Sequence, residues 1–217
     1  MTSRSGYSPV SWTTRGCTQN GQDQGVARVV LVEPYYGGSH RAWADGLVAH
    51  SRHEIHLVTH YAAYWRCRLR RSALSLAAHI AAVFNRHPPP ASLLATDMVH
   101  LAALVGFLRR DLGDPAVALY LHENQLTHPV GPRDRPDEGL ALANWLSMAV
   151  ADRVFVNSDA QLADLRTAIT EWLAEGTASG ATGGVISVSY THLRAHETPE
   201  HLVCRLLLEK KKTPLVR

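Results

Sequence analysis

The sequence predicts an α/β protein in which a parallel β-sheet carries helices on both faces. Apolar, β-branched segments alternate with segments of helical periodicity along most of the 217 residues. The apolar segments are uninterrupted, as in strands that are covered on both faces. Short polar turns link each apolar segment to the helical segment that follows, and alternation this regular is typical of a parallel sheet.

The first three elements follow from local patterns. ARVVLVE predicts a buried strand over 27–33, because it is apolar and β-branched up to a glycine-rich turn. Apolar side chains at helical spacing predict a helix over 39–50, with Ser39 available as its N-cap. EIHLVT predicts a second strand over 54–59.

The middle of the chain repeats this order. After a basic segment, a helix is expected over 72–87, where the prolines of PPP stop it. SLLATD predicts a strand over 92–97, and a helix over 98–113 ends at a glycine. AVALYLH predicts the fourth strand, over 116–122.

The last elements complete the predicted domain. A mostly apolar helix is expected over 137–151, and RVFVNS predicts the fifth strand over 153–158. An amphipathic helix over 159–175 would be capped by Asn157, Ser158 or Asp159.

The chain divides into three predicted parts. Residues 1–25 are rich in Ser, Thr, Gly and Gln and are expected to be disordered, whereas 26–176 form one domain. Residues 177–217 are interpreted as a flexible linker and a tail. SVSYTHLRAHETPEHLVCRLLLEKKK resembles a tail that arises when sequencing-adapter DNA is translated, so residues from about 186 onward are excluded from functional interpretation. A native amphipathic helix is the alternative.

Composition narrows the class of protein. Hydrophobic residues make up 46% and charged residues 19%, as in soluble globular proteins, and no apolar run approaches the roughly 20 residues of a membrane helix. The N-terminus lacks the apolar core of a secretory signal. Three scattered cysteines argue against a disulfide framework or a structural zinc site and fit the cytoplasm. A net charge of +3 is a weak indication of an anionic partner.

Polar clusters follow three of the predicted strands, at the edge where parallel sheets bind ligands. YYGGSH follows the first strand. Its paired glycines let the backbone approach a ligand, and the next helix offers N–H groups to an anion. A phosphate or sugar contact and a tight turn that needs positive φ both remain open. The candidate residues are Gly37, Gly38, Ser39 and His40.

The cluster HENQ follows the fourth strand. No nucleophile elbow and no HExxH motif accompany it, which argues against a serine hydrolase and against zinc. Its side chains suit hydrogen bonding to a hydroxyl-rich substrate, or else they cap the end of the strand. The catalytic candidates are His122 and Glu123, and Asn124 and Gln125 are candidates for binding an acceptor, with Asn157 and Ser158 as secondary residues in VNSD.

A basic run, WRCRLRR, lies between the second strand and the helix predicted over 72–87. Arginines beside an aromatic side chain suit phosphate contact and base stacking. A solvated basic loop is the simpler interpretation. Trp65, Arg68 and Arg70 are the candidate residues for binding an acceptor.

Four segments in the same order give the chain a family resemblance. EPYYGGSHRAWADGL, the pattern WxxRxRxSAL, LYLHENQLTHPV and ADRVFVNSDAQLADL together resemble the tRNA-queuosine mannosyltransferase family, over about residues 28–170. Leu121 departs from a position that is often aromatic, and Cys67 from one where the family tends to carry a second Trp.

The resemblance implies the N-terminal, Rossmann-like half of a GT-B glycosyltransferase. It implies transfer of mannose from GDP-mannose to queuosine in tRNA, with retention and without an essential metal or other cofactor. Gly37 and Gly38 would then lie near the donor diphosphate and His122 near the transferred sugar, with Arg68 and Arg70 facing the RNA. A second, donor-binding domain is expected to be missing, so we expect this fragment to be inactive alone. Oligomeric state is left open.

Two alternatives remain open. The first is a free-standing RNA-binding module that uses the arginine run and the tyrosines without catalysis. The second is a small-molecule hydrolase on a flavodoxin-like sheet, which lacks a nucleophile elbow.

Overall fold

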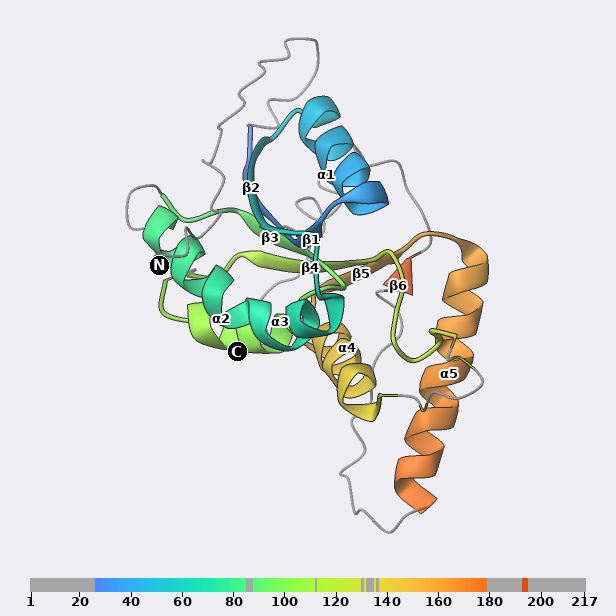
Figure 1. The fold of residues 1–217 in the computed structure, drawn as a ribbon. Helices are drawn as coiled ribbons and strands as arrows, with labels where there is room; N and C mark the ends of the chain where they lie inside the picture. The colour runs from blue at the N-terminus through green and yellow to red at the C-terminus, as the bar shows by residue number, and fades with distance from the viewer. Residues whose placement is uncertain are drawn as a thin grey trace, which may run out of the picture.

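A computed structural model describes residues 26–84, 88–111, 113–129, 131, 135, 137–178 and 193–194. These residues form a parallel sheet with helices on both faces, so the predicted fold class is confirmed (Figure 1). The strand order is β2-β1-β3-β4-β5-β6, and every described pair is parallel. The segment expected to be disordered, 1–25, lies outside the described residues.

The strands are β1 (Arg28–Tyr36), β2 (Glu54–Tyr61), β3 (Ser92–Thr96), β4 (Ala116–Leu121), β5 (Arg153–Val156) and β6 (Leu193–Arg194). The helices are α1 (Gly38–His50), α2 (Trp65–Phe84), α3 (Leu101–Leu108), α4 (Glu138–Val150) and α5 (Asp159–Ala178). Strand β6 lies in the predicted tail, for which no strand was expected.

The helices divide between the two faces of the sheet. Helix α1 packs on one face against Val29, Leu31 and Ile55. Helices α2, α3, α4 and α5 lie on the opposite face, where the larger core contains alternate side chains of the same strands (Figure 1). Both faces of the central strands are therefore buried, which explains their uninterrupted apolar sequences.

Several predicted boundaries were wrong, and β1 runs to Tyr36 rather than Glu33, so it includes the tyrosines of YYGGSH. Helix α2 begins at Trp65 rather than Ser72, so the arginine run forms helical turns and not a loop. Arginine is a good helix former, and Leu69 of this run is buried, which favours helix over loop. The helix expected over 98–113 is shorter and spans Leu101–Leu108, with His100 as its N-cap. None of the described helices is long and apolar enough to cross a membrane.

The strand order sets the place of the site. The chain leaves β1 for β2 on one side and returns to β3 on the other, so the order reverses between β1 and β3. Loops diverge at such a switch point and leave a crevice at the carboxyl ends of the strands. The segments that follow β1, β3 and β4 meet there.

Candidate functional site

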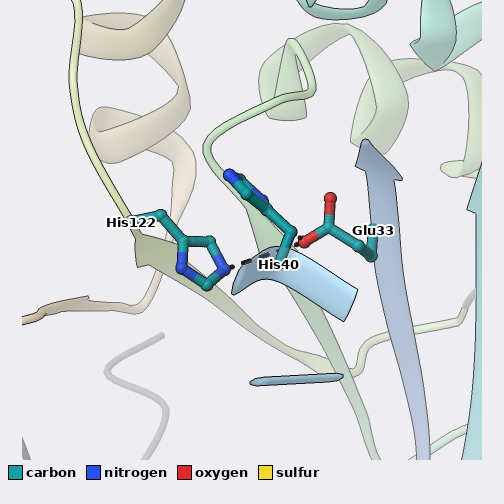
Figure 2. A group of neighbouring side chains, drawn as sticks. All are labelled: Glu33, His40 and His122. Carbon is teal, nitrogen blue, oxygen red and sulfur yellow. Dashed lines mark hydrogen bonds and ion pairs between the residues drawn. The ribbon is translucent and has the colours of Figure 1, made fainter. Parts of the chain in front are cut away.

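Glu33 is the centre of a buried cluster at the carboxyl edge of the sheet. Its side chain is fully buried, and its Oε1 accepts a hydrogen bond of 2.8 Å from the Tyr35 backbone N–H. Its Oε2 lies 3.1 Å from Nδ1 of His40, on the first turn of α1 (Figure 2). A buried carboxylate needs such partners, because burial without them costs several kcal/mol.

The Glu33 carboxylate favours the protonated form of His40. Burial alone would lower the pKa of His40, but the hydrogen bond and the charge of Glu33 outweigh it. The charges of Asp97 and Glu123 act in the same direction, so the pKa is raised above its ordinary value of 6.5. The contact with Glu33 therefore favours a proton on His40 despite its burial.

His122 approaches the same carboxylate from β4. Its Nε2 lies 3.7 Å from Oε2 of Glu33, and its ring centre is 4.0 Å from that of His40. Burial, together with the positive charge of His40, lowers the pKa of His122 to about 3. The pKa values of the two histidines are thus shifted in opposite directions, upward for His40 and downward for His122.

Aromatic rings hold the His122 side chain in place. The Trp43 ring stacks on Tyr120 at 4.3 Å, and both rings meet His122 edge-on, at 5.1 and 4.9 Å. Among the described residues, Nε2 of His122 is a buried polar atom without a hydrogen-bond partner. A neutral imidazole can donate a hydrogen bond from one ring nitrogen and accept one at the other.

Asp97 brings a second buried carboxyl group to the cluster, from the end of β3. Its Oδ1 accepts a 3.0 Å hydrogen bond from the His122 backbone N–H and so fixes the turn that carries this histidine. Burial raises the pKa of Asp97 to about 7, against the lowering effects of His40 and of this hydrogen bond. The cluster consequently contains a carboxyl group that exchanges a proton near neutral pH.

The same cluster has the composition of a metal site. Among the described residues, Glu33, His40 and His122 place three potential ligand atoms within 4.8 Å of one another. Two histidines and one carboxylate suit several transition metals. A metal would compete with the proton on His40 and with its hydrogen bond to Glu33. The expectation of a site without metal stays a prediction.

The glycine turn lies beside this cluster. A Cβ atom on Gly37 would fall 2.4 Å from Cβ of Ala62, so the turn approaches the end of β2 too closely for a side chain. Gly38 has φ of +54°, which favours glycine. Gly37, not Ser39, is the N-cap of α1, and no side chain caps this helix. The first turn can therefore offer its N–H groups to an anion, although that contact stays a prediction.

The loop after β4 has both structural and exposed side chains. Asn124 is buried, and its Oδ1 accepts from the backbone N–H groups of Leu126 and Thr127, so it shapes the turn. The Gln125 backbone N–H donates to Asn144 of α4. Glu123 points instead toward His128, with Oε2 3.7 Å from Nδ1.

This loop lines an open hollow of about 380 Å³. The lining residues are His122, Glu123, Asn124, Thr127, His128, Pro129, Asn157, Ser158 and Gln161. Nearly all are polar, so the hollow suits a hydroxylated or amide-bearing ligand better than an apolar one.

The end of β5 closes the hollow from the other side. Asn157 accepts a hydrogen bond from the Tyr120 hydroxyl at 2.7 Å and donates to the backbone oxygen of His122. The Ser158 hydroxyl accepts from the Gln161 N–H, so the predicted cap of α5 is confirmed. Asn157 links β4 to β5 and positions the turn that carries His122.

The three acceptor candidates on α2 occupy different surroundings. Trp65 lies 6.0 Å from the ring of His128, which brings the start of α2 to the hollow. Arg68 donates to the backbone oxygen of Tyr61 at 3.1 Å, and Arg70 forms an ion pair with Asp137, the N-cap of α4. Contact of these residues with an acceptor stays a prediction.

Sequence reasoning missed Glu33 and Asp97. Each carboxylate stands at the end of an apolar segment, in RVVLVE and SLLATD. An acidic residue there is usually taken as the exposed end of a strand. The signal that could have found them is that an acidic residue ends both apolar segments, which become the neighbouring strands β1 and β3.

Comparisons with known proteins agree with the family resemblance. Residues 28–180 match the family model described as tRNA-queuosine alpha-mannosyltransferase N-terminal. A curated relative, the tRNA-queuosine alpha-mannosyltransferase of Drosophila melanogaster, is 34% identical over 131 residues. This match covers 60% of the present chain and 33% of the relative, so the matched segment spans about a third of the relative's length.

Among solved structures, two of YbtT, the type II thioesterase of the yersiniabactin NRPS/PKS pathway, match weakly. A mutant form is 15% identical with a TM-score of 0.34, and the other form is 14% identical with a TM-score of 0.33. Each match covers 89% of the present chain and 95% or 94% of the thioesterase. Likenesses at this level carry no argument about fold or function.

Proposed function

The chain belongs to the tRNA-queuosine alpha-mannosyltransferase family, as an N-terminal domain, and we propose that its carboxyl edge receives the queuosine nucleotide of a tRNA for mannosylation. The donor in this proposal is GDP-mannose, and the mannose is attached to a hydroxyl of the cyclopentenediol. The cytoplasm is the proposed compartment.

One observation carries the proposal: the neutral His122 stands between a buried carboxylate and a polar, open hollow. A diol offers both donors and acceptors. The imidazole of His122 and the carboxylate of Glu123 can bind neighbouring hydroxyls, because one side chain can donate and the other accepts. Such paired contacts favour a nucleotide with the diol over one without it.

The glycine turn has a matching role in the proposal. The uncapped N-terminus of α1, at Gly37, Gly38 and Ser39, would lie near the diphosphate of the donor. His40 would add positive charge beside it, while His122 would lie near the transferred sugar. No metal is assigned to the transfer.

A GT-B arrangement would complete the donor site with a second domain. The matched segment covers 33% of the Drosophila relative, and we assign most donor contacts to other parts of such relatives. Stabilising an oxocarbenium-like state requires both walls of the cleft. Under this proposal, the chain binds the acceptor but transfers mannose poorly by itself.

An RNA-binding module without catalysis is the second candidate function. The arginines of α2 and the exposed Tyr61 and Tyr64 favour it. It predicts affinity that depends on salt and on unpaired bases, with no preference for queuosine.

The test compares two forms of one tRNA, with queuosine or with guanosine at the same position. The chain is expected to bind the queuosine form about tenfold more tightly, and His122→Gln is expected to abolish the preference. His50→Gln, on the exposed end of α1, is the matched control. Equal affinity for both forms would overturn the proposal in favour of the RNA-binding module, and no affinity for either would overturn both.

A further inference from the structure

Tyr64 has an unusual backbone conformation for a bulky residue. Its φ is +53°, and no other non-glycine residue in the described part of the chain has a positive φ. Residues other than glycine, asparagine and aspartate rarely adopt this left-handed backbone conformation, because their Cβ atom approaches the neighbouring carbonyl group. Such strain persists where the surrounding structure enforces it, and it is concentrated at functional sites.

Hydrogen bonds hold the strained turn. The backbone oxygen of Tyr64 accepts from the N–H groups of Cys67 and Arg68, at 2.8 and 3.1 Å, and so starts α2. The Arg68 guanidinium and the Ala63 N–H both donate to the backbone oxygen of Tyr61. The turn is thereby fixed at both ends.

Burial does not offset this strain. The Tyr64 side chain is 81% exposed and that of Tyr61 is 70% exposed, so the turn presents two aromatic rings to solvent three residues apart. A structural role would place at least one ring in the core. The exposure of both rings indicates a ligand with flat apolar faces.

Charge identifies the class of ligand. The first two turns of α2 contain Arg66, Arg68, Arg70 and Arg71, and the first turn has no acidic residue. The Arg66 guanidinium lies 4.6 Å from the centre of the Trp65 ring. Exposed aromatic rings beside arginines are the usual surface for single-stranded nucleic acid, where rings stack on bases and guanidinium groups contact phosphates.

We propose that Tyr61 and Tyr64 form a stacking platform for unpaired bases that flank the modified nucleotide, with Arg66 and Arg71 contacting the phosphates. The platform is joined to the hollow through Trp65, whose ring lies 6.0 Å from His128. An unpaired loop can therefore rest its bases on the turn while one nucleotide enters the hollow. This inference rests on the proposed function for the identity of the RNA.

Two variants of Tyr64 separate the contribution of the aromatic ring from that of the backbone conformation. Tyr64→Asn removes the ring but tolerates positive φ, and Tyr64→Phe keeps the ring. The probe is an anticodon stem-loop RNA with 2-aminopurine in its loop. Tyr64→Asn is expected to lower affinity about tenfold and to remove the fluorescence quenching caused by stacking, with an unchanged or higher Tm. Tyr64→Phe should behave like the original chain, as should Phe107→Ala, which removes an exposed ring from α3.

The results also distinguish a failure of the stacking platform from a failure of the proposed queuosine recognition. The loss in Tyr64→Asn should be equal for the queuosine and guanosine forms of the tRNA, because the platform does not contact the diol. Unchanged RNA affinity in Tyr64→Asn, with a preserved queuosine preference, would overturn the platform alone. Binding to anionic phosphatidylserine vesicles that depends on Tyr64, without an effect on RNA, would overturn it in favour of a membrane surface.

Discussion

Nδ1 of His40 lies 3.1 Å from Oε2 of Glu33, and both side chains are buried where β1 gives way to α1. This contact joins the end of a central strand to the first turn of the helix that follows it. It also places His40 beside His122, whose ring centre is 4.0 Å away. The raised pKa of His40 therefore depends on Glu33.

Replacing Glu33 by glutamine should reverse the pKa shift of His40. Without the carboxylate, burial dominates, and the pKa of His40 should fall below 6.5. The contribution of the pair to stability is present at low pH and is lost as pH rises through the raised pKa of His40. We expect Glu33→Gln to cost about 3 kcal/mol at pH 6. NMR titration of the His40 ring and urea unfolding measure the two effects.

Glu54→Gln is the matched control, because Glu54 pairs with Arg28 at 3.2 Å near the surface. It should cost at most about 1 kcal/mol and leave His40 unchanged. An unaltered His40 titration in Glu33→Gln would contradict the assignment of the pair.

Asp97 should make stability depend on pH in the opposite sense to most carboxylates. Burial raises its pKa from 3.8 to about 7, so the folded state retains a proton that the unfolded state loses. Its contribution to stability therefore falls as pH rises between those values, by at most about 1.4 kcal/mol per pH unit. Asp97→Asn keeps an acceptor for the His122 N–H and removes the titration.

The free energy of unfolding of Asp97→Asn, relative to the original chain, should thus increase from pH 5 to 7 and level off above. Denaturant unfolding at several pH values measures it. Asp111→Asn, at an exposed position after α3, is the control variant. A constant offset in Asp97→Asn would show that Asp97 is ionised throughout.

Sequence reasoning located the candidate site but not its contacts. Parallel strands share one carboxyl edge, so YYGGSH and HENQ were expected there together. The pairing of Glu33 with His40 and the approach of His122 depend on the order β1-β3-β4, which local patterns do not contain. The same holds for the ion pair of Arg70 with Asp137, which joins residues far apart in the chain.

The close approach of Gly37 to Ala62 predicts that alanine has opposite effects on stability at two positions, Gly37 at the N-cap of α1 and Gly46 inside the helix. Gly37→Ala would place Cβ 2.4 Å from Cβ of Ala62, and we expect a loss of about 1–3 kcal/mol. Gly46→Ala, inside α1 with open space around it, should gain about 0.5–1 kcal/mol. Thermal unfolding compares them. Ala62→Gly should rescue most of the loss in Gly37→Ala, and failure of this rescue would show that the contact is not its cause.

The ion pair between Arg70 and Asp137 predicts a gain of RNA affinity from removing a carboxylate. Asp137 also caps α4 by accepting from the Leu140 N–H, and asparagine caps helices equally well. Asp137→Asn should therefore keep α4 intact while it releases Arg70 for a phosphate. We expect RNA affinity to rise a few-fold at low salt, with a steeper salt dependence, whereas stability changes by less than about 1 kcal/mol.

A double-mutant cycle checks this coupling. Arg70→Ala alone should weaken RNA binding only slightly, because Arg70 must first leave Asp137. In the Asp137→Asn background, Arg70→Ala should remove the whole gain. Equal effects of Arg70→Ala in both backgrounds would mean that the ion pair does not restrain Arg70, and that any gain in Asp137→Asn comes from the lost negative charge alone.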